Sequence, residues 1–164
     1  MGAPMPLQGP LFQRTPERLV LQGFRLWTAG YATGDLRQWD DVWTIYTEVL
    51  GANQARLMVE QLAQWVASIQ AWSVGPIRCF PGSCPHVCRQ ECFALATISA
   101  SQHEDLDCLA AAMGSLVDPE GTEQTMRQTV AFAEAMKENG LRLMPVPCCV
   151  IQEIAGRPPV EKMH

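Results

Sequence analysis

The chain has 164 residues, of which 48% are apolar and 18% charged, and its formal net charge is −5. This length is typical of a single domain, and the apolar fraction excludes disorder for most of the chain. The ten Arg and two Lys form no cluster, so a surface that binds nucleic acid is not expected. We expect a cytoplasmic protein without a membrane span, because no apolar run approaches about 18 residues and residues 1–12 lack the pattern of a signal peptide.

Apolar residues recur at steps of three and four along most of the chain, which predicts an all-α, single-domain bundle of about six helices. Glycine, proline and short polar residues mark the expected helix ends. Trp43 and Trp65 lie on two of the apolar stripes, and we expect both side chains to be buried. The predicted helices cover residues 17–32, 36–50, 53–72, 85–103, 106–116 and 120–139.

Both ends of the chain differ from this helical domain, which we assign to residues 15–154. Residues 1–14 contain three Pro and two Gly, a composition that predicts an extended N-terminal arm. Two prolines interrupt residues 141–154, so we expect an extended segment packed on the bundle. Residues 155–164 are expected to form a polar C-terminal tail. The low charge fraction and the arm favour a homo-oligomer or a complex with another protein.

Seven cysteines are many for a cytoplasmic domain, and an odd number argues against a complete set of disulfides. Four of them and one histidine lie within fourteen residues, in the segment CFPGSCPHVCRQEC. Thiolates are the soft ligands that hold zinc and iron–sulfur clusters. We therefore predict a metal centre of zinc or an iron–sulfur cluster in an accessory, assembly or regulatory subunit. Its predicted ligands are Cys79, Cys84, Cys88 and Cys92, with His86 as the substitute ligand.

Two other functions are open. If a helix begins at Pro85, Cys84 lies at its N-terminus, where the helix dipole lowers the pKa of a thiol. Cys88 would follow one turn later, so the pair could serve a thiol oxidoreductase. In the third hypothesis the protein is a helical adaptor or structural protein with inert cysteines, since free cysteine is among the most buried residue types.

The remaining three cysteines have no assigned role. Cys148 and Cys149 are adjacent and point in different directions, so at most one of them faces a given site. Either could complete a cluster as a distant ligand or pack within an apolar segment. Cys108 stands in the apolar stretch LDCLAAAM, which is typical of core. The sequence contains no nucleophile–base pair and no phosphate-binding loop, so a hydrolase or a kinase is not expected.

Overall fold

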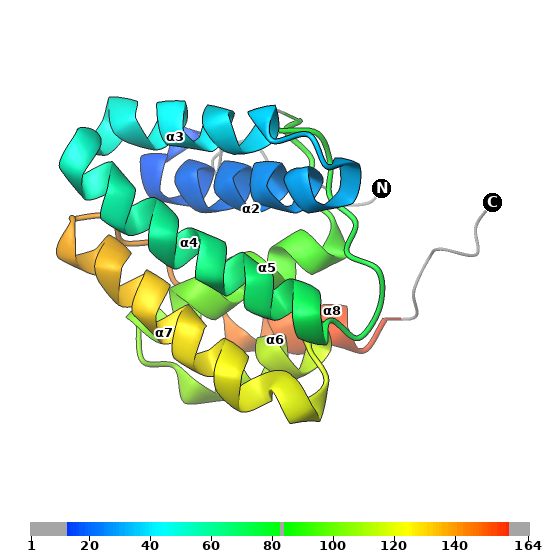
Figure 1. Ribbon diagram of the computed structural model, residues 1–164. Coiled ribbons are helices and arrows are strands. Elements are labelled where there is room, and N and C mark those ends of the chain that lie inside the picture. Colours follow the sequence, from blue (N-terminus) through cyan, green and yellow to red (C-terminus); the bar gives the residue numbers. More distant parts are fainter. Residues whose placement is uncertain (1–12, 83, 158–164) are drawn as a thin grey trace.

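The structure is a computed structural model that describes residues 13–82 and 84–157 (Figure 1). Within these ranges all regular elements are helices, apart from one isolated bridge between Ser73 and Val117. The predicted all-α fold is therefore confirmed. The helices are α2 (Thr15–Thr33), α3 (Arg37–Leu50), α4 (Ala52–Trp72), α5 (Arg89–Gln102), α6 (Leu106–Leu116), the short 3-10 helix η1 (Pro119–Gly121), α7 (Thr122–Glu138) and α8 (Cys148–Ala155).

Local sequence signals set most helix ends. Five of the six predicted helices agree with the structure to within two residues at each end. Gly34 follows α2 with a φ of 73°, and Gly51 follows α3 with a φ of 84°. Glycine adopts this left-handed backbone without steric cost, so it ends a helix well. The exception is the helix predicted at 85–103, which begins only at Arg89.

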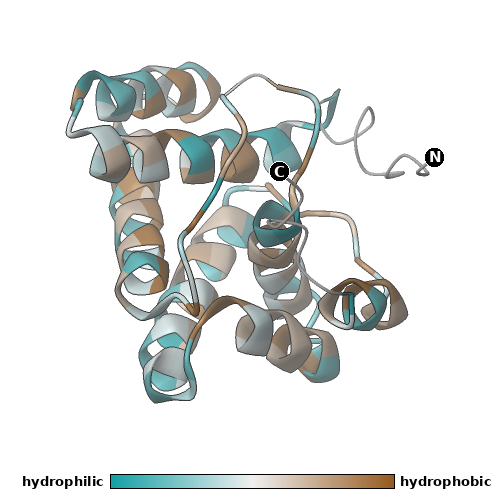
Figure 2. Cartoon of the chain, turned by 90° about the vertical axis from the view of Figure 1, so that its right-hand side faces the viewer, coloured by the Kyte–Doolittle hydropathy of each residue, from teal (hydrophilic) through white to brown (hydrophobic). Residues whose placement is uncertain are grey.

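Helix α5 lies at the centre of the bundle, and every residue from 91 to 100 is buried. Helices α6 and α7 pack against α5, α4 packs against α7, and α2 and α3 pack against α4 and each other (Figure 1). Helix α8 lies against α6. Figure 2 shows both hydrophilic and hydrophobic stretches along most helices, as expected for amphipathic helices around one core.

The two tryptophans that the sequence places in the core have different environments. Trp65 of α4 is 0% exposed, as predicted, and its ring lies 5.5 Å from that of Phe24 and 5.2 Å from that of Phe132. Trp43 is 36% exposed, so the prediction that it is buried is wrong. Helix α3 is at the edge of the bundle and buries Val42, and Trp43 is turned by about 100° from that side chain around the helix.

After a turn at 139–140, residues 141–147 form no helix or strand, in agreement with the prediction of a non-helical segment. Buried side chains hold this segment on the bundle. The Gln102 side chain of α5 accepts a hydrogen bond from the Leu143 amide at 2.7 Å. The Glu17 carboxylate of α2 accepts one from the Met144 amide at 2.7 Å. These two contacts fix the chain directly before α8.

The prediction of an extended chain throughout 141–154 is wrong for its second half, where α8 begins at Cys148. Pro147 occupies the position before the helix, where its missing N–H is not required. The two prolines therefore exclude a helix only before residue 148. The apolar side of α8 buries Ile151.

Most of the predicted N-terminal arm (residues 1–14) and C-terminal tail (155–164) lies outside the described residues. At the inner end of the arm, the Arg14 guanidinium donates to the Glu17 carboxylate at 2.8 Å. None of the helices in the described ranges combines the length and the apolar character needed to cross a membrane.

Candidate functional site: the cysteine-rich loop and its buried ion pair

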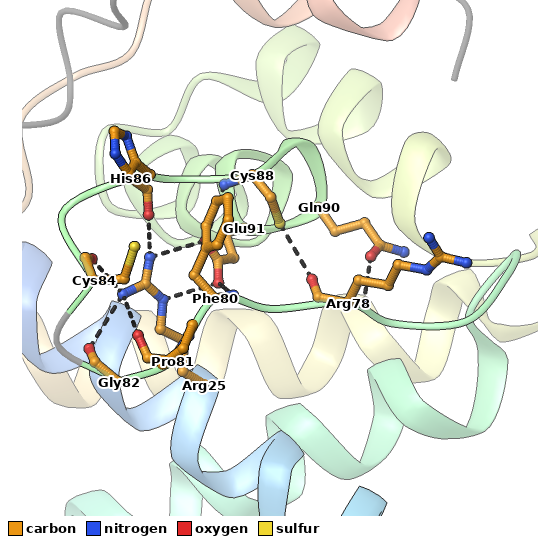
Figure 3. Close-up of polar contacts among 10 residues, drawn as sticks. All are labelled: Arg25, Arg78, Phe80, Pro81, Gly82, Cys84, His86, Cys88, Gln90 and Glu91. Atoms are coloured by element: carbon orange, nitrogen blue, oxygen red, sulfur yellow. Dashed lines mark hydrogen bonds and ion pairs between the residues drawn. The ribbon is translucent and has the colours of Figure 1, made fainter. Parts of the chain in front are cut away.

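Residues 73–88, here called loop 73–88, join α4 to α5 and contain four of the five predicted metal ligands. The loop runs beside α2, which contributes Arg25 beneath it (Figure 3). Arg25 and Glu91 are 2% and 0% exposed. The guanidinium Nε donates to Glu91 Oε2 at 2.8 Å and Nη2 donates to Oε1 at 3.0 Å. This two-point geometry is the strong form of an ion pair between arginine and a carboxylate.

The remaining N–H groups of Arg25 bind the backbone of loop 73–88. Nη1 donates to the carbonyls of Pro81, Gly82 and Cys84, at 3.2, 3.1 and 2.7 Å. Nη2 donates to the carbonyl of His86. Figure 3 shows these carbonyls turned inward around the guanidinium. One buried side chain of α2 thus fixes the path of residues 81–82 and 84–86.

Glu91 fixes the same loop from the other side. Besides the guanidinium, its carboxylate accepts hydrogen bonds from the Phe80 amide at 2.9 Å and the Cys88 amide at 3.0 Å. The second bond is half of a capping box, in which Cys88 is the residue that caps α5. The ion pair therefore joins α2, the loop and the first turn of α5 in one buried network.

This network explains why α5 begins four residues later than predicted. The sequence favours a start at Pro85, but the carbonyls of Cys84 and His86 accept hydrogen bonds from Arg25. Those carbonyls would otherwise accept the first bonds within the helix. Cys84 thus does not lie at the N-terminus of α5, so the helix-dipole argument for an oxidoreductase site at Cys84 no longer applies.

Among the predicted ligands, Cys88 lies close enough to Cys79 and to Cys92 to affect the pKa of each thiol. Burial and the neighbouring Glu91 carboxylate together raise the pKa of Cys88 to about 11. Burial, Cys88 and Glu91 together raise the pKa of Cys92 to about 12. Burial, Glu91 and Cys88 likewise raise the pKa of Cys79 far above its ordinary value. The Cys88 thiol donates to the Arg78 carbonyl at 3.2 Å. These thiols are therefore protonated at neutral pH.

The other two predicted ligands, Cys84 and His86, show no contact with these three thiols among the described residues. Cys84 is partly buried, and His86 is exposed, with its ring 6.1 Å from that of Phe80. Figure 3 shows the His86 ring turned away from Arg25. Among the residues that the structure describes, no group of three or more His, Cys, Asp or Glu side chains is arranged to hold a metal ion. The metal centre thus stays a prediction.

The raised thiol pKa values predict that the protein loses stability in alkali. In the unfolded chain these thiols lose their protons near the ordinary pKa of 9.0, whereas in the folded chain Cys88 keeps its proton up to about 11. Between these values the unfolded state binds fewer protons, so the free energy of unfolding falls as pH rises. Thermal melts from pH 7 to 10.5 should show this fall. Cys88→Ser should make it shallower, and Cys149→Ser, at an exposed position on α8, should not.

The sequence reasoning missed Arg25 and Glu91, the two residues that organise this site. Their sequence separation of 66 residues gives no local pattern. An arginine beside Phe24 in an apolar stripe is the one signal in the sequence, because a buried charge requires a partner. No protein-family model matches the chain, and comparisons with curated proteins and with solved structures found no match.

Proposed function

We propose that the protein is a helical adaptor or accessory subunit, and that loop 73–88 is its contact surface for a protein partner. The observation that carries this proposal is the set of hydrogen bonds from the buried Arg25 to four carbonyls of the loop. A long loop normally loses much conformational freedom when a partner binds it. Here folding has already fixed the loop, so binding costs little additional entropy.

The exposed side chains of the loop define the chemistry of the partner. Val74 is 56% exposed and Phe80 is 37% exposed, so the loop presents apolar groups to solvent. Arg78 and His86 are exposed near them in the sequence and supply positive or titratable groups. This combination suits a partner that offers an apolar pocket flanked by carboxylates. In this proposal the thiols beneath the loop have a packing role.

A metal centre is the second candidate, and the closeness of Cys88 to both Cys79 and Cys92 favours it. Three thiols from the loop and the first turn of α5 are the donor type that zinc prefers. Binding would release the thiol protons, so the affinity would rise with pH. Cys84 or His86 would be the fourth ligand in this alternative.

The adaptor proposal predicts a partner contact at Phe80. A photo-crosslinking amino acid at position 80 should capture a specific partner in cells, and the same group at Val130 should not. Val130 is the matched control because it is 44% exposed on α7, away from the loop. With the purified partner, Phe80→Ala should weaken binding by about tenfold or more, as for a central apolar contact, and Val130→Ala should leave the affinity unchanged. Equal cross-linking from both positions, or equal affinities of both variants, would contradict the proposal.

Metal analysis and thermal melts test whether the protein holds a metal centre. Protein purified without chelator is assayed for zinc and iron, and melting temperatures are compared with and without added zinc. The adaptor proposal expects no bound metal and no change in melting temperature. A stoichiometric metal would instead support the second candidate, if Cys79→Ser, Cys88→Ser and Cys92→Ser each lose it while Cys108→Ser retains it.

A further inference from the structure

A second group of thiols lies where α8 packs on α6, apart from the cysteine-rich loop. Cys108 of α6 is 0% exposed, and its thiol donates to the Val146 carbonyl at 3.8 Å. Cys148, the first residue of α8, is partly buried against the same core. The two thiols lie close enough for each to affect the pKa of the other. Both are free thiols in the structure.

We propose that Cys108 and Cys148 are a redox site that forms a reversible disulfide by exchange with low-molecular-weight disulfides. The reaction requires two thiols side by side, and the packing of α8 on α6 brings the Cys108 thiol within 3.8 Å of the carbonyl of Val146, two residues before Cys148. The two residues lie on different helices and are 40 positions apart in the chain. Oxidation would therefore fasten α8 covalently to α6, and reduction would release it.

Cys148 is only partly buried, so it is the residue that reacts first with the oxidant. Its thiolate attacks one sulfur of a disulfide RSSR, which forms a mixed disulfide and releases RS⁻, and RS⁻ takes up the proton that Cys148 lost. Cys108 then loses its proton and attacks the Cys148 sulfur, which releases the second RSH. In total, two electrons pass from the two protein thiols to RSSR, and the products are one protein disulfide and two RSH.

The surroundings of the pair make this exchange slow at neutral pH. Burial and the nearby Asp105 together raise the pKa of Cys108 to about 11. Burial, Asp105 and Asp107 also raise the pKa of Cys148, and the adjacent Cys149 adds to this. Since the thiolate is the reactive form, the rate of oxidation should rise about tenfold per pH unit below these pKa values. The reduced pair is thus protected from brief exposure to oxidant.

Adjacent Cys149 is the matched control because it is exposed on the same helix. The full-length reduced protein is incubated with glutathione disulfide, alkylated, and cleaved with a protease specific for glutamate. Cleavage after Glu104 separates Cys108 from Cys92. The fragment with Cys108 should be linked to the fragment with Cys148 in the wild type and in Cys149→Ser. The link should be absent in Cys108→Ser and Cys148→Ser.

The oxidised protein should also melt at a higher temperature than the reduced form, because a cross-link between α6 and α8 restricts the unfolded chain. If Cys108→Ser does not fold, Cys148→Ser decides the result, since that thiol is partly exposed. A link that persists in Cys148→Ser would assign the reaction to Cys149 and overturn the proposal. Glutathione attached without a protein disulfide, or thiols that stay fully alkylatable after prolonged incubation, would also overturn it.

Discussion

Replacing Arg25 with methionine is expected to lower the free energy of unfolding by about 3–5 kcal/mol, the usual cost of removing one partner from a buried ion pair. The substitution leaves the Glu91 carboxylate buried without its guanidinium. It also removes the donor for four carbonyls of loop 73–88. Urea denaturation followed by circular dichroism measures the loss, and hydrogen exchange should become faster in residues 80–88.

Arg37→Met is the matched control. Arg37 also pairs with a carboxylate, Asp35 at 3.0 Å, but its side chain is 87% exposed. Exposed ion pairs contribute little to stability, so this variant should unfold close to the wild type. The double variant Arg25→Met/Glu91→Met should be less unstable than the sum of the two single variants, since it leaves no buried charge alone. Equal small losses for Arg25→Met and Arg37→Met would contradict the assigned role of the ion pair.

The fold could be predicted because its signals are local. Apolar residues at helical spacing within α4 predict that helix. The glycines directly after α2 and α3 predict where those two helices end. Such signals do not depend on what the rest of the chain does. This is why α2, α3, α4, α6 and α7 agree with the predicted ranges.

The candidate site could be predicted only as a segment. The sequence pointed to the cysteines between Cys79 and Cys92, and the structure places Cys88 near Cys79 and near Cys92. The residue that fixes their loop is Arg25, on a helix more than 50 residues away in the chain. Its hydrogen bonds displace the start of α5 from Pro85, where local preference favoured it. A tertiary contact of this kind has no local sequence pattern.

Trp65→Ala is expected to lower the free energy of unfolding by about 3–5 kcal/mol, as large-to-small aromatic changes in cores do. The Trp65 ring is fully buried between Phe24 of α2 and Phe132 of α7. Its loss opens a cavity where three helices meet, because neither phenylalanine ring can fill the space alone. Thermal and urea unfolding of the purified variant measure the effect.

Trp43→Ala tests the same residue type at the edge of the bundle and should cost about 1 kcal/mol, near the average for a point substitution. The Trp43 side chain is 36% exposed, so water already covers part of its surface and can occupy the space that it leaves. The difference between the two variants depends on burial alone, since both remove the same atoms from a helix. Equal losses of unfolding free energy in the two variants would contradict the edge position of α3. A small loss for Trp65→Ala would contradict the assignment of the contact of α2, α4 and α7 to the centre of the core.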